Sequence, residues 1–319
     1  MKGWGLLAER LDLVAVGAAN VDLIMLVDKF AGADEEVSAK GFRLEGGGSA
    51  ANVAVGASRL GLKAGFIGNI GTDVFGSILE KSFKEEGVDI THLKKLNSQT
   101  GVAVCVVDGK GERSIYVYNE TNLMFSEKQL DEAYIASSRC VYVSSMQGEL
   151  AFKAIEHLCD IAHVHGVPVF FDPGHILAEK GIQGLRKTLE KSTILKLNRE
   201  ESVMLTGTRN VEEASLKILA HGPSVVLITL GEEGCYLRTS SLGRQIPGYK
   251  SFKAVDRTGA GDSFNAAFIA GFLKGWSLEK CVKFGNLVAG VSVTRIGARS
   301  TPTVKELKAY GEYAEFEDG

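Results

Sequence analysis

The chain has no surplus of positive charge and few cysteines, and both shortages narrow the classes of function. Its 36 Lys and Arg residues face 39 Asp and Glu residues, and no long basic run combines with aromatic residues. Nucleic acid is therefore not an expected partner, because phosphate backbones are bound through clustered cations. The five cysteines lie far apart without a Cys-x-x-Cys pair, which favours scattered thiols in a reducing compartment over a disulfide framework or a zinc site.

Long apolar runs and an N-terminal secretory pattern are also missing. No apolar stretch approaches the roughly 18 uninterrupted residues of a membrane span. Charges at Glu9, Arg10 and Asp12 precede the first apolar run, which is not the arrangement of a secretory signal. We therefore expect a cytoplasmic protein that has no membrane segment.

The composition predicts a large globular core, and the residue pattern predicts an α/β fold. Of 319 residues, 45% are hydrophobic and 24% charged, which is a globular balance. Short β-branched runs alternate with segments of helical period, the pattern of a mostly parallel sheet flanked by helices. The predicted strands are Leu13–Val16, Ala64–Ile67, Val141–Ser144, Val167–Asp172, Thr193–Leu197 and Val225–Leu230. The predicted helices include Ala50–Leu60, Val74–Glu86, Leu150–His165 and Val211–His221.

Two stretches, Glu36–Leu44 and Gly101–Tyr118, show period-2 alternation instead. The second contains the turn signal Asp108–Gly111, which predicts a hairpin. Such strands predict a small antiparallel sheet, which is either a lid over the main body or a hairpin at the sheet edge. No repeat, low-complexity tract or linker divides the chain, so we expect a single domain over residues 1–319 with these strands inserted.

Residues 255–274 join a loop of small residues to an apolar helical pattern. The loop therefore lies at a helix N-terminus, where the free N–H groups of Gly259, Ala260 and Gly261 would bind an anion such as phosphate. Asp262 follows in the first helical turn, where its carboxylate would take a proton from an attacking hydroxyl. The competing interpretation is structural, with Asp262 as a helix cap and the glycines as a turn.

Longer patterns around these residues resemble the PfkB/ribokinase family of carbohydrate kinases. Residues 255–264, Val-Asp-Arg-Thr-Gly-Ala-Gly-Asp-Ser-Phe, resemble its C-terminal signature, and residues 46–54 with 68–76 resemble its N-terminal signature. The resemblance runs from about Leu13 to Pro302 and implies a ribokinase-like α/β fold with a small β-sheet lid. It also implies transfer of a phosphoryl group from ATP, with Mg²⁺, to a hydroxyl of a small sugar or sugar derivative, with Asp262 as base.

The resemblance places the acceptor between the main body and the lid. The matching residues in this chain are Asn20, Asp22, Gly47, Gly48 and Asn52, with Glu149 near the position of a further sugar-contacting acid. Each has an ordinary alternative: Asp22 as a turn residue, Asn52 as a polar group at a helix start, and Glu149 as a favourable charge at a helix N-terminus.

The same resemblance assigns nucleotide and ion sites. Asn198 and Glu201 match a pair that holds Mg²⁺ through water, although an N-cap with a capping box explains the same spacing. The residues implied at the nucleotide are Asn198, Thr229, Gly231, Gly234 and Asn286, the last of which would otherwise be a helix residue facing solvent. A monovalent cation such as K⁺ is implied at Asp256, Thr258, Gly297 and Thr301.

Two departures from the family pattern bear on the substrate. Ser49 stands where ribokinases have Lys, and Arg257 where a small or hydroxyl residue is common. Archaeal nucleoside kinases of the family also show small residues after the diglycine, so a nucleoside is a rival acceptor. A non-catalytic sugar or nucleotide sensor is another alternative, and an oxidoreductase is disfavoured because Gly17–Asn20 lacks G-x-G-x-x-G spacing. By analogy with the family, we expect a homodimer through the lid.

Overall fold

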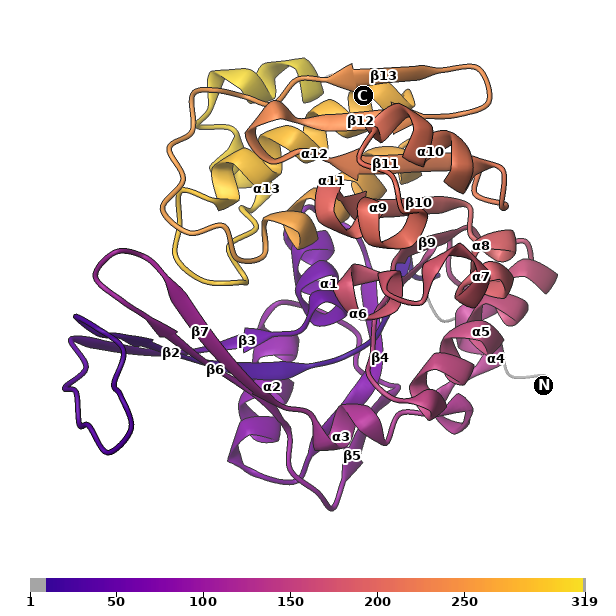
Figure 1. Cartoon of the computed structure of the whole chain (residues 1–319). Coiled ribbons are helices and arrows are strands. Elements are labelled where there is room, and N and C mark those ends of the chain that lie inside the picture. Colours follow the sequence, from indigo (N-terminus) through magenta and orange to yellow (C-terminus); the bar gives the residue numbers. More distant parts are fainter. Residues whose placement is uncertain (1–9, 318–319) are drawn as a thin grey trace.

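Nine strands of the described chain, residues 10–317 of the computed structural model, form the central sheet of the main body (Figure 1). The residues at both ends of the expected domain, 1–9 and 318–319, lie outside the described residues. The strands run in the order β13 (Gly243–Ile246), β12 (Cys235–Arg238), β11 (Val225–Thr229), β10 (Ile194–Asn198), β9 (Val169–Asp172), β8 (Val141–Ser144), β1 (Leu13–Val16), β4 (Ala64–Gly71) and β5 (Leu93–Leu96). All neighbours pair in parallel except β12 with β11 and β13 with β12.

The parallel strands are apolar on both faces because helices cover both faces. Leu13 and Ala15 belong to one buried cluster, whereas Val14 and Val16 belong to the other, as the alternation of side chains in a strand requires. The first cluster packs against α1 (Ser49–Arg59), α2 (Val74–Glu85), α11 (Ala260–Leu273) and α12 (Leu278–Ser292). The second packs against α4 (Glu132–Ala136), α5 (Glu149–Val164), α8 (Arg186–Lys191), α9 (Arg199–Thr206) and α10 (Val211–Leu219).

The predicted α/β class is confirmed, and the six predicted sheet strands correspond to β1, β4, β8, β9, β10 and β11. The four predicted helices correspond to α1, α2, α5 and α10. The remaining short helices are α3 (Glu120–Leu123), α6 (Gly174–Ala178), α7 (Gly181–Gly184), α13 (Val304–Leu307) and 3₁₀ turns at Glu127–Gln129, Gly231–Glu233 and Gly311–Phe316. Within residues 10–317, no helix is long and apolar enough to cross a membrane.

The second sheet contains four strands of the described chain, in the order β3 (Gly41–Gly47), β2 (Asn20–Leu26), β6 (Gly101–Val107) and β7 (Arg113–Tyr118). The predicted hairpin is β6–β7, but β2 was not predicted, and it pairs with β6 in parallel, so the sheet is mixed and not antiparallel. The strand predicted over 36–44 lies instead at 41–47. Its register with β2 runs from Asn20–Gly47 to Leu26–Gly41, and residues 36–40 lie before the strand, with the N–H of Lys40 donating to the carbonyl oxygen of Leu26 at 2.7 Å.

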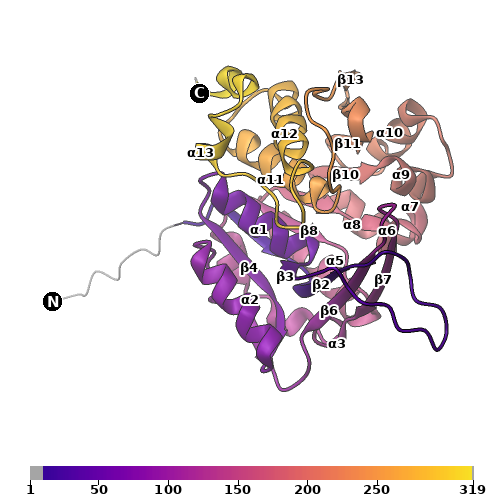
Figure 2. The same cartoon turned by 90° about the vertical axis from the view of Figure 1, so that its left-hand side faces the viewer.

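The small sheet projects beside the carboxyl-terminal ends of the parallel strands (Figures 1 and 2). Its strand β2 continues from β1, and β3 leads directly into α1. At the hairpin, Nη1 of Arg113 donates to Oγ1 of Thr258 at 2.6 Å, which joins the small sheet to the loop before α11. This contact brings the small sheet across the edge of the main sheet at which ligands bind in open α/β folds.

Helix α11 is buried along most of its length, including every residue from Ser263 to Gly271. Within it, the ring of Phe268 lies 5.8 Å from that of Phe170 and stacks on that of Phe264 at 6.3 Å. The helix that carries the Gly259–Asp262 motif is therefore fixed by the core, so its N-terminus is held in place by packing on both sides.

We expect Phe268→Ala to lower the free energy of unfolding by about 3–5 kcal/mol, because it leaves a cavity in this fully buried aromatic cluster. Urea denaturation followed by circular dichroism measures the change. Val164→Ala, at a 76% exposed position, is the control and should change stability by less than about 1 kcal/mol. Equal losses for the two variants would mean that α11 is not anchored by this cluster.

Candidate active site

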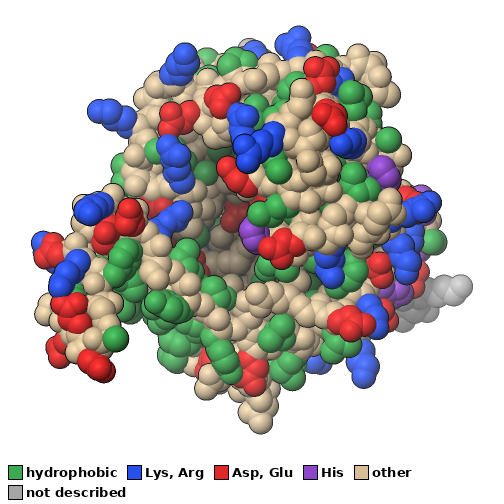
Figure 3. All heavy atoms as spheres, viewed as in Figure 1, with side chains coloured by type: hydrophobic (Ala, Val, Ile, Leu, Met, Phe, Trp, Pro, Cys, Tyr) green, Lys and Arg blue, Asp and Glu red, His purple; other side chains and the backbone are tan. Residues whose placement is uncertain are grey.

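A polar cavity of about 490 Å³ lies between the small sheet and the carboxyl ends of the main strands, and Figure 3 shows its opening as a hollow. Its wall brings together residues from the small sheet, α1, the strand ends and α11. The lining residues predicted from the sequence are Asn20, Asp22, Gly48, Asn52, Glu201, Thr258, Gly259, Gly261 and Asp262. Segments that are far apart in the chain thus meet around one polar space.

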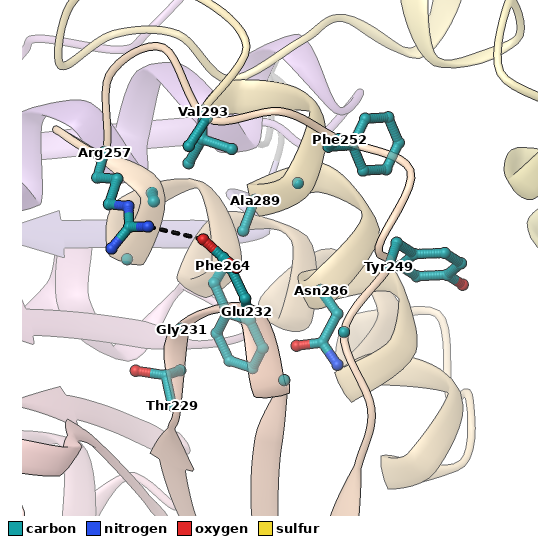
Figure 4. A pocket seen from close by; sticks show the side chains of 16 residues that line it. Thr229, Gly231, Glu232, Tyr249, Phe252, Arg257, Phe264, Asn286, Ala289 and Val293 are labelled. Atoms are coloured by element: carbon teal, nitrogen blue, oxygen red, sulfur yellow. Dashed lines mark hydrogen bonds and ion pairs between the residues drawn. The ribbon is translucent and has the colours of Figure 1, made fainter.

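An adjoining apolar cavity of about 200 Å³ lies between the turn after β11 and helices α11 and α12 (Figure 4). Four residues predicted at a nucleotide line it, namely Thr229, Gly231, Gly234 and Asn286. Aromatic and aliphatic side chains complete the wall, among them Tyr249, Phe252, Phe264, Ala289 and Val293. Gly261 lines both cavities, so the two spaces adjoin at the N-terminus of α11.

The amide of Asn286 is buried and does not face solvent. Its Nδ2 donates to the carbonyl oxygens of Ile246 at 3.2 Å and Pro247 at 3.0 Å, so it holds the segment after β13 against α12. At the mouth of the apolar cavity, Arg257 pairs with Glu232 at 2.6 Å (Figure 4). The arginine of this exposed pair is the residue that stands where the family commonly has a small or hydroxyl residue.

The turn before α11 requires glycine at position 259. Gly259 has φ 75° and ψ 2°, and a Cβ there would lie 2.0 Å from the carbonyl oxygen of Ala298. The preceding loop is fixed by Asp256, whose Oδ1 accepts from the N–H of Thr258 at 2.9 Å and whose Oδ2 accepts from that of Gly297 at 3.0 Å. Helix α11 therefore begins at Ala260, and Ala260 and Gly261 line the apolar cavity where the polar cavity adjoins it, with the N–H of Ala260 donating to the carbonyl oxygen of Arg257 at 3.3 Å.

Asp262 is half-buried in the first turn of α11 and faces the polar cavity. Nδ2 of Asn52, from α1, donates to its Oδ2 at 2.9 Å. Burial raises the pKa of Asp262 to about 7, against the opposing effects of Asn52 and Lys196. A carboxyl group whose pKa lies near neutrality is well suited to accept a proton at physiological pH.

Lys196 is a functional candidate that the sequence analysis missed. Its side chain is 7% exposed in β10, and its Nζ lies 3.2 Å from Oδ2 of Asp172 and 3.1 Å from the place that a Cβ on Gly261 would take. Burial alone would lower the pKa of Lys196, but the carboxylates of Asp172 and Glu201 raise it above its ordinary value. The signal was available, because a lysine inside a predicted buried strand needs a partner.

Asp172 is itself held from a second side. Nδ2 of Asn265, in α11, donates to Oδ2 of Asp172 at 2.7 Å and lies 3.3 Å from the hydroxyl of Tyr142. All three side chains are buried. The carboxylate that pairs with Lys196 beneath the N-terminus of α11 is thus fixed by α11 as well as by Lys196.

Asp22 and Asn20 extend from the small sheet into the polar cavity. Burial raises the pKa of Asp22 to about 6, and the charge of Arg299 opposes this rise. Gly47 leaves room for this carboxylate, since a Cβ there would lie 2.3 Å from Oδ1 of Asp22. Oδ1 of Asn20 accepts from Nδ2 of Asn122 at 2.6 Å, and Asn122 also lines the cavity although the sequence analysis did not select it.

The expectation for Glu149 is not supported by its position. The side chain is 79% exposed at the start of α5 and pairs with Lys153 at 2.8 Å, as i,i+4 neighbours on a helix do. The neighbouring Gln147 lines the polar cavity instead. Residue 147 thus borders the cavity, whereas residue 149 lies in the first helical turn and faces solvent.

Asn198 and Glu201 form a capping box at the start of α9. The N–H of Glu201 donates to Oδ1 of Asn198 at 2.8 Å, and Oε2 of Glu201 accepts from the N–H of Asn198 at 2.8 Å. Glu201 is also buried, which raises its pKa, and it lines the polar cavity. Capping thus holds a carboxylate at the cavity wall, next to Lys196 and Asp172.

Of the four residues expected at a monovalent cation, three are joined by hydrogen bonds and the fourth bonds to another partner. Asp256 joins Thr258 and Gly297, but the hydroxyl of Thr301 pairs with Ser263 in α11 at 2.8 Å. Nη1 of Arg113 lies 3.9 Å from Oδ1 of Asp256 and brings positive charge to it. No group of three or more His, Cys, Asp and Glu side chains suited to a metal occurs in residues 10–317.

Comparison with known proteins agrees with this geometry. The model of the pfkB family of carbohydrate kinases matches residues 10–305. The chain belongs to the PfkB family of carbohydrate kinases. This PfkB-family chain is 33% identical over 316 residues to the ribokinase of Haemophilus influenzae, covering 96% of this chain and 100% of that protein.

Two solved structures show the same fold. The ribokinase of Arabidopsis thaliana, complexed with ribose and ATP, superposes with a TM-score of 0.83 at 26% identity and covers 94% of this chain and 98% of that one. A nucleoside kinase of Methanocaldococcus jannaschii, an archaeal member of the ribokinase family, gives a TM-score of 0.81 at 25% identity with the same coverage. The ribokinase-like architecture predicted from the sequence is therefore confirmed.

The need for glycine at position 259 can be tested by comparison with a second glycine of nearly the same backbone conformation. Gly207 has nearly the same conformation, φ 74° and ψ 6°, but nothing lies within 4 Å of its would-be Cβ. We expect Gly207→Ala to cost about 1 kcal/mol and Gly259→Ala to cost roughly 2 kcal/mol more, because only the second meets a carbonyl oxygen. Chemical denaturation of both variants measures the difference, and equal costs would contradict the close contact with Ala298.

Proposed function

We propose that this PfkB-family kinase transfers the terminal phosphoryl group of ATP to a hydroxyl of a small sugar or sugar derivative, with Asp262 as general base. The observation that carries the proposal is the position of Asp262, beside Gly261, where the polar and apolar cavities adjoin. A base at the junction of an acceptor space and a donor space meets the geometric need of direct phosphoryl transfer.

The polar cavity suits a polyhydroxylated acceptor. Its wall presents carboxylate and amide groups at Asp22, Asn20, Asn52, Asn122 and Gln147. Such fixed donors and acceptors recognise hydroxyl groups by hydrogen bonding, whereas an apolar pocket does not discriminate them strongly. The names of the relatives agree, since one is a ribokinase and another is a ribokinase complexed with ribose and ATP.

The apolar cavity suits the base of a nucleotide. Phe252, Ala289 and Val293 supply apolar surface, and Thr229 and Gly231, at the end of β11 and in the turn after it, also line the cavity (Figure 4). A nucleotide seated there would extend its phosphates toward Gly261 and the polar cavity. ATP, which is present in the Arabidopsis complex, is the donor that we propose.

The mechanism assigned to this chain needs positioning and charge stabilisation more than covalent chemistry. Asp262 accepts the proton of the attacking hydroxyl. The N–H groups of Gly259 and Gly261 and the ammonium of Lys196 would face the growing negative charge on the transferred group, and the N–H of Ala260 between them also donates to the carbonyl oxygen of Arg257 at 3.3 Å. Docking of the small sheet through Arg113 and Thr258 would exclude water, which competes as an acceptor.

Mg²⁺ fits the donor set at Glu201. This carboxylate is buried at the cavity wall, and burial raises its pKa, so a nearby cation would stabilise its charged form. Mg²⁺ keeps several of its waters and takes one or two protein oxygens together with phosphates, so Glu201 and Asn198 would hold it through water. When bound, the ion would neutralise phosphate charge. We do not extend the proposal to a monovalent cation, because the hydroxyl of Thr301 bonds to Ser263 and Arg113 already brings positive charge to Asp256.

A nucleoside is the alternative acceptor. Three apolar side chains, Val117, Met146 and Ile176, also line the polar cavity and would contact a base. Ser49 lines it where ribokinases carry Lys, and the Methanocaldococcus jannaschii relative is a nucleoside kinase. An acceptor panel therefore has to contain both sugars and nucleosides.

The proposal is tested by ATP consumption with Mg²⁺ across sugars, sugar phosphates and nucleosides. One acceptor class should be phosphorylated, and Asp262→Asn should lower kcat by on the order of a hundredfold or more. Because the pKa of Asp262 is raised to about 7, its carboxylate form is lost as the pH falls through that value. We therefore expect kcat/KM to decline toward acid with a midpoint near pH 7.

Asp131→Asn is the matched control, because Asp131 caps α4 and asparagine caps equally well. It should keep wild-type kcat and stability. If no acceptor is phosphorylated, the kinase proposal fails. If Asp262→Asn retains wild-type kcat, Asp262 is a helix residue only and not the base.

We also propose a homodimer through the small sheet. The face opposite Asp22 carries Phe42, Leu44, Tyr116 and Tyr118, which are 62%, 36%, 67% and 51% exposed. Apolar side chains gather over this region in Figure 3. A contiguous exposed apolar face of this kind favours association, and a second copy offers the same face in return.

Sedimentation equilibrium tests the dimer. The wild-type chain should sediment at twice its mass of 34.1 kDa, and Tyr116→Glu should shift the equilibrium toward monomer because it buries a charge in the interface. Val164→Glu places the same charge at an exposed site on α5, outside the small sheet, and should leave the dimer intact. A wild-type monomer at micromolar concentration would overturn the proposal.

A further inference from the structure

Arg299 lies in the segment between α12 and α13, and its guanidinium is enclosed on two sides. Its Cζ lies 5.1 Å from the centre of the Phe83 ring in α2. On the other side is Gly46 of β3, where an added Cβ would lie 2.2 Å from the same Cζ. The side chain therefore fills the space between the main body and the small sheet, and only glycine at position 46 leaves room for it.

The main chain at Arg299 is fixed as well. Nη1 of Arg59, in α1, donates to the carbonyl oxygens of Arg299 at 2.6 Å and Thr301 at 3.0 Å. Nε of Arg59 pairs with Oε2 of Glu86 at 2.9 Å. The backbone from 299 to 301 is thereby attached to α1, which also carries Asn52.

The guanidinium of Arg299 is linked to Asp262, the proposed base, through the side chain of Asn52. Its Nε donates to Oδ1 of Asn52 at 3.2 Å, and its Nη1 donates to Oγ of Ser82 at 2.8 Å. The other end of the Asn52 amide, Nδ2, donates to Oδ2 of Asp262 at 2.9 Å. A chain of two hydrogen bonds thus runs from Arg299 through Asn52 to Asp262.

The hydrogen bonds from Arg299 through Asn52 to Asp262 can form with only one orientation of the Asn52 amide. A guanidinium has donors and no acceptor, so it pairs only with the oxygen end of the Asn52 amide. The NH₂ end is then left facing Asp262, where it stabilises the carboxylate. Without Arg299 the amide is free to turn, and its oxygen would face Asp262 and favour the protonated acid.

We propose that Arg299 is a positioning residue of this kinase, which fixes the Asn52 amide so that Asp262 is held as a carboxylate ready to accept the proton of the acceptor. The inference rests on the proposed role of Asp262 as base. The same guanidinium also stabilises the charge of Asp22, so Arg299 acts on two of the carboxylates of the polar cavity, Asp22 and Asp262.

The other charged and titratable groups that face Asp262 come from different elements. Lys196 of β10 favours its carboxylate, whereas Asp172 of β9 opposes it, and the charge of Asp262 in turn acts on Tyr142 of β8. Within residues 10–317, none of these three side chains forms a hydrogen bond or ion pair with Arg299, whose guanidinium donates to Asn52 and Ser82. A change at position 299 therefore reaches Asp262 through Asn52.

A double-mutant cycle tests this coupling. The variants are Arg299→Met, Arg299→Lys, Asn52→Ala and the double variant Arg299→Met with Asn52→Ala, assayed for kcat, KM and the pH dependence of kcat/KM. Arg238→Met is the matched control, because Arg238 is 11% exposed and bonded to the hydroxyl of Tyr236 at 2.6 Å but lines neither cavity.

Arg299→Met should lower kcat at neutral pH by roughly 10- to 100-fold, since the base is misoriented. The acid limb of kcat/KM should move upward by about one pH unit, so activity is partly regained at higher pH. In the Asn52→Ala background the same change should alter kcat by no more than about twofold, because the intermediary is gone. Arg299→Lys should restore part of the loss, and Arg238→Met should shift neither kcat nor the limb.

The inference is overturned if Arg299→Met leaves the acid limb in place, or if its effect on kcat is as large without Asn52 as with it. Failure of the base assignment is recognised separately, by an active Asp262→Asn enzyme. Carbon-13 NMR titration of labelled aspartate, assigned with Asp262→Asn, reads the pKa of Asp262 without turnover. A pKa that is equal in wild type and Arg299→Met, which removes the donor to Asn52, would also overturn it.

Discussion

The polar cavity contains more negative than positive charge, and this excess governs the rest of the site. Four carboxyl groups line it, those of Asp22, Asp172, Glu201 and Asp262, whereas Lys196 is the one Lys or Arg among the described residues of its wall. Burial raises the pKa of three of them, Asp22, Glu201 and Asp262. Carboxylates held together away from water are stabilised by an added cation, which in a kinase arrives with the nucleotide.

The pairing of the parallel strands brings several of these charged side chains together, so they do not need separate loops to position them. Asp172 ends β9, Lys196 lies in the neighbouring β10, and Thr229 ends β11, so parallel pairing brings them to one edge of the sheet. Helix α11 then meets that edge with its N-terminus. The electropositive end of the helix, Asp262 in its first turn, and the paired Lys196 and Asp172 all lie at this junction, so opposite charges are neighbours there. A phosphoryl group moving between the cavities would meet the ammonium and the helix end beside the proposed base.

Much of this arrangement follows from local sequence. The strands β1 and β8 and the turn at Gly259 depend on neighbouring residues, and period and turn chemistry predicted them. The contacts that were missed are non-local. Arg299 and Asn52 are 247 positions apart, and Asn20 and Asn122 are 102 apart, so no periodicity links them. The strand β2 was missed for a related reason, since its two neighbours in the small sheet lie later in the chain.

For several residues the sequence left open a structural and a functional interpretation, and the structure is compatible with both at once. Asn198 and Glu201 form the capping box that the structural interpretation required, and the same hydrogen bonds hold Glu201 at the cavity wall. Asn52 lies in the first turns of α1, as a helix-start residue would, and still reaches Asp262. A capping interaction fixes a side chain before any ligand arrives. Ligand binding then costs that side chain little conformational entropy. Helix ends are therefore places where stability and pre-organisation use the same hydrogen bonds, and a cap is no argument against a role in binding.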